Sequence, residues 1–453
     1  MPTSDGARRW WATFSESFSS RIWPLPVAAT IGAVIAGVFL PILDAAVDQN
    51  LSGWFQALLF GGGTDAARAV LTTISGSLIT ATSLTFSLTV VALQLASNQA
   101  SPRLLRTFAS DRMVHLTLAI FLGTFAYSLT VLRTVSDTGD EVPRISITLA
   151  FVLTLGSVIV LVLFLAHLAS RLRVETMLRD VHRETDRTIA LVGSDDRPTA
   201  PAPARPDQVD IVAARRSGFV TGIDRDRLIS AGHEHGAVIR EVCRVGASVI
   251  EGTILAEWWP GPDAGADRPT PMTRADRSTL EQAIVDAYSI DYERTPPQDI
   301  GYGLRQIADV ATKALSPGVN DPTTAVHALS HVAALLGDLA ELPPSPSAYA
   351  DDDGLARVVP VAHDFRELVE VGVQQPRRYG ASDPDVAARL FDLIGDVGRR
   401  TTRPEHVRVL EGQLERLVAS VDAADYDPTE RAEFARLAAR ARATLTRAGS
   451  EIA

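Results

Sequence analysis

Four long apolar stretches in the first 170 residues constrain the fold of this chain more than any other feature. They cover residues 25–47, 69–96, 113–131 and 145–169. Each approaches or exceeds the roughly 20 residues that a helix needs to cross a hydrocarbon core. The first is longer than the apolar region of a cleavable signal peptide. The sequence therefore predicts four transmembrane helices in contact with a lipid bilayer.

Charge is distributed unevenly between the two halves of the chain. Residues 1–170 carry 9 acidic and 9 basic side chains, and the remaining 45 of 54 acidic and 34 of 43 basic side chains follow them. With a mean hydropathy of +0.11, this distribution predicts a membrane half joined to an acidic, water-soluble half. The pI of about 5.4 argues against nucleic acid as a partner.

Arginines gather beside the apolar stretches in three places. They precede the first stretch, lie between the second and third, and follow the fourth: Arg8, Arg9, Arg21, Arg103, Arg106, Arg112, Arg171, Arg173 and Arg179. Because positive charge favours the cytoplasmic side of a membrane, we expect the N-terminal segment 1–22 and everything after Arg171 to be cytoplasmic.

The second apolar stretch is rich in polar side chains that share one side of a helix. At about 100° per residue, seven of them fall within a stripe roughly 120° wide. They are Thr73, Ser77, Thr80, Ser83, Ser87, Gln94 and Asn98. One interpretation is that they line a pore or substrate path. The other is close helix packing, which small and hydroxyl side chains favour.

The segment after the fourth stretch begins the soluble half. Residues 171–191 predict a charged amphipathic helix, and the Pro/Ala/Asp-rich segment 193–208 predicts a linker. Short β-branched runs separated by glycine at 209–259 then predict a small all-β module. Within it, residues 245–257 resemble the hairpins of biotinyl and lipoyl carrier domains. Those domains need a lysine on a hairpin tip, and here none exists, so at most a barrel-sandwich scaffold is expected.

Two features of this half bear on metal binding and enzyme activity. His233, Glu234 and His235 form an H-E-H run near the single cysteine, Cys243. They are either metal ligands or, as we favour, a surface turn without a fixed third and fourth ligand. The single lysine, Lys313, leaves no Walker-type phosphate loop, and no other catalytic motif is present. We therefore predict no enzyme, cofactor, catalytic residue or metal site.

Helical patterns follow a second linker at 260–271 and define a helical domain at 272–453. Helices are predicted at about 273–292, 299–314, 322–341, 363–375, 384–400, 404–421 and 428–447, with a surface loop at 343–354. Thr273 and Asp276 suit a capped helix start.

The segment 298–329 carries the densest pattern of polar residues in the helical domain. Asp321 can cap a helix whose first residue is Pro322. Such a helix start can also hold an anion on its free N–H groups. The candidate ligands are Arg305, Lys313, Asn320, Asp321, Thr323 and Thr324. A capped turn between packed helices is the alternative.

Two motifs in the chain resemble one family. The hydroxyl-rich helix running into LQLASNQASPRLLRTF (93–108) and the segment IGYGLRQIADVATKALSPGVNDPTTA (300–325) are similar to predicted bacterial membrane proteins with domain of unknown function 2254. The resemblance covers nearly the whole chain and implies a multi-pass bacterial inner (plasma) membrane protein. Lys313 stands where arginine is expected in that family. The family brings no catalytic residues.

Two functions fit these patterns. The first is a channel or transport protein, with the hydroxyl-rich helix lining a path and the cytoplasmic half as a regulatory domain. The alternative is a membrane-anchored ligand-sensing or scaffold protein without transport activity. The further partners to test are other copies of this chain, in a homo-oligomer, and a small anionic ligand. The predicted architecture is a four-helix membrane bundle (23–170), an amphipathic helix and linker (171–208), a β module (209–259) and a helical domain (272–453).

Overall fold

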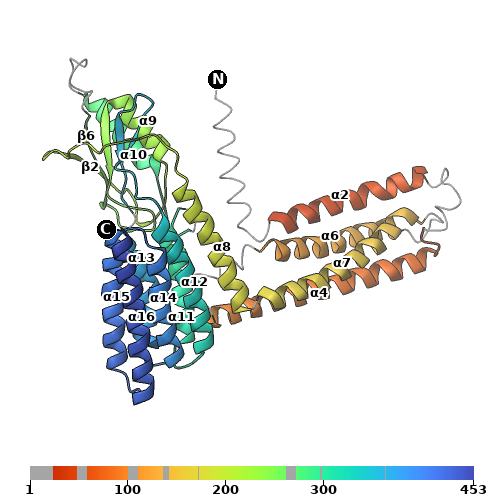
Figure 1. The fold of residues 1–453 in the computed structure, drawn as a ribbon. Helices are drawn as coiled ribbons and strands as arrows, with labels where there is room; N and C mark the ends of the chain where they lie inside the picture. Colours follow the sequence, from red (N-terminus) through yellow and green to blue (C-terminus); the bar gives the residue numbers. More distant parts are fainter. Residues whose placement is uncertain are drawn as a thin grey trace. The chain divides into compact units, whose positions relative to one another are not determined.

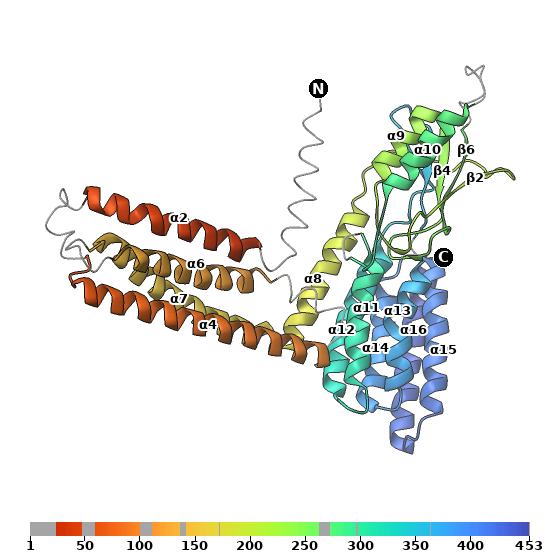
Figure 2. The same ribbon diagram turned by 180° about the vertical axis from the view of Figure 1, so that it is seen from behind.

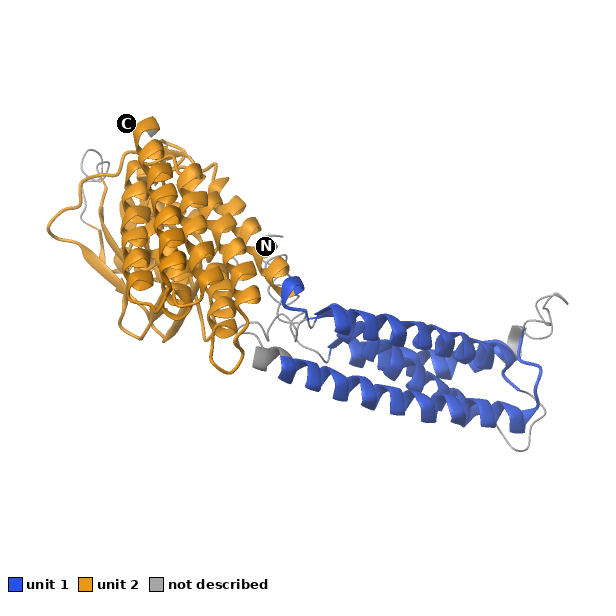
Figure 3. Ribbon diagram, turned by 60° about the horizontal axis from the view of Figure 1, so that its bottom comes forward, with its two compact units in different colours: residues 1–176 blue, residues 177–453 orange. Residues whose placement is uncertain are grey.

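The computed structural model describes residues 24–47, 59–99, 111–135, 142–171, 173–261, 272–295, 298–362 and 364–452. It divides into two compact units, unit 1 (Met1–Thr176) and unit 2 (Met177–Ala453), shown in Figure 3. The N-terminal segment 1–22, residues 100–110 and most of the second predicted linker lie outside the described residues.

Unit 1 contains four long helices, with α6 at their centre. They are α2 (Pro24–Val47), α4 (Thr64–Gln99), α6 (Arg112–Thr134) and α7 (Arg144–Arg171). All four are long and apolar enough to cross a membrane, as predicted. α6 is the most buried and packs against each of the other three (Figure 1). The bundle therefore depends on α6, while the outer helices expose much of their surface.

Buried polar groups join three helices at one end of unit 1. Asp44 of α2 is buried, and its Oδ2 accepts hydrogen bonds from the N–H (2.9 Å) and hydroxyl (3.2 Å) of Ser146 in the first turn of α7. Tyr127 of α6 donates to the Ser146 carbonyl at 3.0 Å. A carboxylate at a helix start satisfies free N–H groups and complements the helix dipole. Asp44 therefore acts as a cap supplied by another helix.

A second polar contact ties the start of α6 to the end of α7. Asp111 Oδ1 accepts the N–H of Met113 at 2.9 Å and so caps α6. Its Oδ2 lies 2.6 Å from Nε2 of His167 and 3.4 Å from Nε of Arg171. His167 is thus part of a charged helix cap.

Unit 2 begins with an α/β region built on two sheets. The larger sheet has the order β1-β8-β9-β4-β6-β2 and is antiparallel except between β4 and β9. Its strands are β1 (Thr199–Ala200), β2 (Asp210–Ala213), β4 (Ala237–Glu241), β6 (Ile254–Pro260), β8 (Ala348–Ala350) and β9 (Ala356–Val359). The smaller sheet is β5-β3-β7, from β3 (Gly218–Ile223), β5 (Ser248–Val249) and β7 (Tyr288–Asp291).

Helices α9 (Arg225–His235) and α10 (Arg274–Ala287) pack against each other and contribute to the core of this region. Among the fully or almost fully buried members of the core are Val220, Leu228, Ile239, Leu255, Trp258 and Ile284. The core therefore draws residues from both sheets and both helices, which makes the α/β region one folded body.

The prediction of an all-β barrel-sandwich module at 209–259 is wrong in two respects. First, α9 lies inside it, capped by Asp224 at its start and by Gly236 in the left-handed conformation (φ 61°) at its end. Second, β5 and β6 belong to different sheets, so residues 245–257 form no hairpin. Asp224 and Gly236 are ordinary helix boundary signals. The prediction missed this helix because it gave more weight to the short β-branched runs.

Three other segments also differ from prediction because of tertiary pairing. The supposed linker 193–208 contains β1, and the supposed loop 343–354 contains the buried strand β8, with which β1 pairs. The hydroxyl of Tyr349 in β8 donates to Asp195 at 2.7 Å. The helix after Thr273 ends at Ala287, where β7 begins.

The rest of unit 2 is a bundle of α-helices close to the predicted one (Figure 2). Its members are α11 (Ile300–Ala314), α12 (Pro322–Glu341), α13 (Phe365–Gly380), α14 (Pro384–Arg400), α15 (Pro404–Asp422) and α16 (Pro428–Ile452). The capping box of Thr273 and Asp276 is confirmed at the start of α10.

Helix α8 (Val174–Gly193), the predicted amphipathic helix, follows α7 and contacts α11 and α12 of this bundle. It buries Leu178, Val181, Thr185 and Ile189, which recur at helical spacing and so form one face. Thr185 lies so close to Gly303 of α11 that a Cβ added at Gly303 would overlap its hydroxyl oxygen. Glycine is therefore needed at position 303 for this close approach.

Candidate functional site

The predicted polar stripe lies on the exposed side of α4. Six of its members have exposed side chains on unit 1: Thr73, Ser77, Thr80, Ser83, Ser87 and Gln94. The opposite side of α4 buries Leu71, Ile74 and Leu78 in the core that includes Phe121 and Tyr127 of α6. The side chain of Asn98 lies outside the described residues.

The stripe presents hydroxyl groups along a shallow groove. Thr73 donates to the Ala69 carbonyl at 2.7 Å and Thr80 to the Gly76 carbonyl at 2.9 Å. Donation to the carbonyl four residues earlier satisfies the hydroxyl proton and leaves the oxygen able to accept. Thr73, Gly76, Ser77, Thr80, Ala81 and Leu84 line the groove. The surface is therefore mixed, with acceptor oxygens between apolar side chains.

Packing within the described part of unit 1 does not account for these six side chains. In the part of unit 1 that the structure describes, α4 packs mainly on α6 and also on α7, and the stripe faces neither helix. Thr85 is the hydroxyl of α4 that is fully buried. The described helices of unit 1 therefore leave the stripe uncovered.

The segment 314–325 forms a capped turn between α11 and α12. Asp321 Oδ1 accepts the N–H of Thr324 at 3.0 Å, and its Oδ2 accepts the Thr324 hydroxyl at 2.6 Å. These hydrogen bonds hold the pKa of Asp321 below its usual range, so the cap is ionised at neutral pH. Asn320 just before it is exposed and adopts a left-handed conformation (φ 49°).

The six predicted ligands therefore differ in how available they are. Asp321 and Thr324 bind each other, and the Asp321 carboxylate occupies the helix start and opposes a second anion there. Thr323 is exposed, whereas Arg305 and Lys313 are partly buried in α11. The cap is confirmed, and binding of an anion by the remaining residues stays a prediction.

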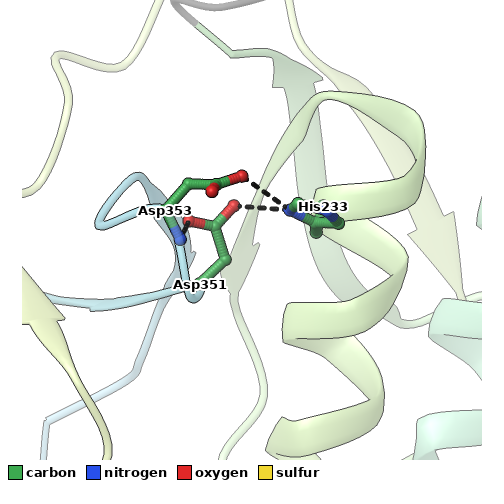
Figure 4. Close-up of side chains that lie close together, drawn as sticks. All are labelled: His233, Asp351 and Asp353. Carbon is green, nitrogen blue, oxygen red and sulfur yellow. Dashed lines mark hydrogen bonds and ion pairs between the residues drawn. The ribbon is translucent and has the colours of Figure 1, made fainter.

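A second cluster joins α9 to the turn between β8 and β9, and only one of its members, His233, was a candidate ligand from the sequence. Figure 4 shows His233 of α9 facing Asp351 and Asp353. His233 Nδ1 lies 2.9 Å from Asp351 Oδ2 and 3.8 Å from Asp353 Oδ2. The three groups are close enough to share a metal ion. His233 is half-exposed, and Asp351 is buried.

Arg357 makes this cluster an ion-pair network. Its guanidinium is buried, and Nε donates to Asp351 Oδ2 at 2.5 Å. The N–H groups of Asp353 and Leu355 donate to the other carboxylate oxygen. Burial tends to raise the pKa of Asp351, but the hydrogen bonds from His233 and Arg357 outweigh it and lower that pKa to about 2. Asp351 in turn raises the pKa of His233. The positive charge that a metal would supply is already present.

The H-E-H run does not gather into a metal site with Cys243. His233 and His235 are two residues apart on α9, which places them about 200° apart around the helix. His235 Nδ1 lies 3.1 Å from the Ala231 carbonyl, and the Cys243 thiol donates to the Ile254 carbonyl. The prediction of a surface turn was also wrong, because the run ends a helix. Sequence alone gave no signal for Asp351, which is 118 residues away.

Comparisons with known proteins place the chain in a family. The family model described as "Predicted membrane protein (DUF2254)" matches residues 19–396. This chain belongs to that family. It is 31% identical over 441 residues to the uncharacterised proteins Rv1290c of Mycobacterium tuberculosis and Mb1321c of Mycobacterium bovis, covering 95% of this chain and 81% of each relative. No solved structure matches the chain. The resemblance seen in the sequence is thereby confirmed.

The Asp351 network predicts a large loss of stability when one partner is removed. Asp351→Asn should lower the free energy of unfolding by about 3–5 kcal/mol, because it removes the negative charge that is paired with the buried Arg357 guanidinium. Asp353→Asn, at a largely exposed carboxylate, should change it by less than about 0.5 kcal/mol. Denaturant unfolding of the full chain in detergent measures both values. Equal effects of the two substitutions would contradict this role of Asp351.

The cap at Asp321 predicts a graded mutational series. Asp321→Ala should cost about 0.5–2 kcal/mol, whereas Asp321→Asn and Asp321→Ser should stay near the wild type, because each keeps an acceptor for the helix start. The same unfolding assay measures the series. If Asp321→Asn is as damaging as Asp321→Ala, the negative charge matters beyond capping.

Proposed function

We propose that this protein is a channel or transport protein of the bacterial plasma membrane, in which the polar stripe of α4 lines a path between copies. The observation that carries the proposal is the exposure of six polar side chains on a helix whose opposite side is buried. Hydrocarbon offers no partner for hydroxyl oxygens or for the Gln94 amide. Water, a substrate or another polar surface would supply one.

A purely structural role for unit 1 explains this surface less well. An anchor needs only apolar side chains toward lipid, and α7 has them: Phe151, Val152, Leu155, Val158, Ile159 and Val162 are all exposed. The contrast between α7 and α4 supports a polar path at α4. A scaffold or ligand-sensing protein without transport is the alternative, and it predicts no flux.

We propose further that unit 2 is cytoplasmic. The arginines that flank the four spans support this orientation, since they lie in the segments before α2, between α4 and α6, and after α7. The acidic unit 2 would then serve as a regulatory domain, joined to the last span through α8.

Flux and accessibility test the path. Proteoliposomes with the wild-type protein should pass small ions or solutes that empty liposomes retain. Thr80→Val, which removes the hydroxyl at nearly constant shape, should reduce the flux several-fold. Thr154→Val is the matched control, because the hydroxyl of Thr154 on α7 also bonds to the carbonyl four residues earlier. In a Cys243→Ser background, Ser83→Cys should react with a small hydrophilic thiol reagent, and Ile159→Cys should not.

Two outcomes would contradict the proposal. One is a wild-type flux no greater than that of empty liposomes for any species tried. The other is equal protection of the cysteines at positions 83 and 159, which would place the stripe away from water.

Reporter fusions test the orientation. A reporter active only in the cytoplasm should be active when fused near residue 300 or after Ala453, because the flanking arginines hold these segments on the cytoplasmic side. A periplasmic reporter at the same positions should be silent. The reverse pattern would overturn the orientation without touching the proposed path.

A further inference from the structure

Three histidines from two helices are in contact in unit 2. The ring of His182 in α8 lies 4.8 Å, centroid to centroid, from that of His331 in α12, with the ring planes 63° apart. The ring of His327, also in α12, lies 5.1 Å from that of His331. α8 lies beside the bundle in both ribbon views (Figure 1, Figure 2). Three side chains of the type that gains a proton close to neutral pH therefore meet where α8 contacts the bundle.

His182 lies on the face by which α8 contacts the bundle. It follows Leu178 by four residues and precedes Thr185 by three, and both of these side chains are buried. Thr185 lies against Gly303 of α11. Nδ1 of His182 is itself buried and has no hydrogen-bond partner in the part of the chain that the structure describes. A proton added to Nδ1 would need an acceptor that this contact does not supply.

A carboxylate of α8 faces the histidines. Oδ2 of Asp186, one turn after His182, lies 3.4 Å from Nε2 of His182. This carboxylate can balance the charge of one imidazolium, whereas the three histidines can carry three positive charges. Burial, with His182 and His327 nearby, lowers the pKa of His331 to about 4. The docked arrangement therefore favours the neutral form of His331.

The other charged side chains of α8 near His182 do not relieve this repulsion. Glu175 and Arg179 precede His182 by about two turns and one turn and are exposed, so water screens them. The remaining ones lie about 100° or more around the helix from His182 and are Asp180, Arg183, Glu184 and Arg187.

The neighbouring helices supply no further counter-charge at this contact. On α12, Asp338 follows His331 by two turns, and its Oδ1 is paired with Nη2 of Arg400 at 2.7 Å. On α11, the residues one turn beyond Gly303 are buried and do not titrate: Gln306 and Ile307. The charged residues of α11 at this level lie more than about 100° around the helix from Gly303 and are Arg305 and Asp309.

We propose that the contact between α8 and α12 is a pH-sensitive switch. α8 stays docked while His182, His327 and His331 are neutral, and it is released when they gain protons, because neighbouring imidazolium ions repel one another. A released His331 regains the ordinary pKa of 6.5, whereas a docked one has a pKa of about 4. Docking is therefore at full strength above about pH 6.5 and weakens as the pH falls from there towards 4.

The place of α8 in the chain gives the switch its consequence. α7 ends at Arg171 and α8 begins at Val174, so α8 directly follows the last span. Acidification would therefore free the helix that follows the membrane unit. The inference concerns contacts within unit 2 and does not depend on a flux through unit 1.

Hydrogen–deuterium exchange of the full chain in detergent tests the switch. Protection of the backbone amides of α8 is compared at pH 7.5 and pH 5.5, with labelling times scaled to the intrinsic exchange rate at each pH. We expect the protection factor of α8 to fall about tenfold at pH 5.5, because only the released form of His331 binds a proton there. A released helix of 20 residues is marginally stable, so its amides exchange. Peptides from α14, which contains no histidine, should keep their protection.

Glutamine variants assign the effect to the histidines. His331→Gln keeps a polar side chain that gains no proton in this range, and it should reduce the change in α8 protection between the two pH values to less than about twofold. His182→Gln should reduce the change in the same direction. The matched control is His233→Gln, which alters a histidine of another cluster and should keep the tenfold change.

Three results would overturn the proposal. The first is equal protection of α8 at both pH values in the wild-type chain. The second is a tenfold change that persists in both His331→Gln and His182→Gln. The third is loss of protection in α8 and α14 together at pH 5.5, since acid would then open the bundle as a whole and not the contact of α8.

Discussion

A hydrocarbon environment satisfies no hydrogen-bonding group, and the rest of this structure can be understood from that constraint. α6 packs against the three other spans, and its Tyr127 donates a hydrogen bond to the Ser146 carbonyl. Asp44, at one end of the bundle, accepts a hydrogen bond from the N–H of Ser146. α7 faces outward with apolar side chains. The polar stripe of α4 differs, because its hydroxyl and amide side chains are exposed on the described surface of unit 1. It is therefore the best indicator of function in unit 1.

Unit 2 pairs buried charged groups in networks. Asp351, Arg357 and His233 form one that is nearly complete.

Local sequence signals predicted much of the fold. They did not predict the parts that depend on pairing between residues far apart in the sequence. Hydropathy located all four spans, and Asp321 with Pro322 marked the start of α12 correctly. β1 and β8 were not predicted, because each is only two or three residues long and forms by pairing with the other. The stripe on α4 was visible as a helical pattern, but its exposure was not.

The central claim is that the polar stripe of α4 faces water or a neighbouring copy. The most direct measurement is a structure of the assembled protein in a lipid nanodisc by electron cryo-microscopy. We expect Thr80 and Ser83 of each copy to face a symmetry axis or a hydrated space between copies. A monomer, or an assembly in which these side chains face acyl chains, would contradict the claim.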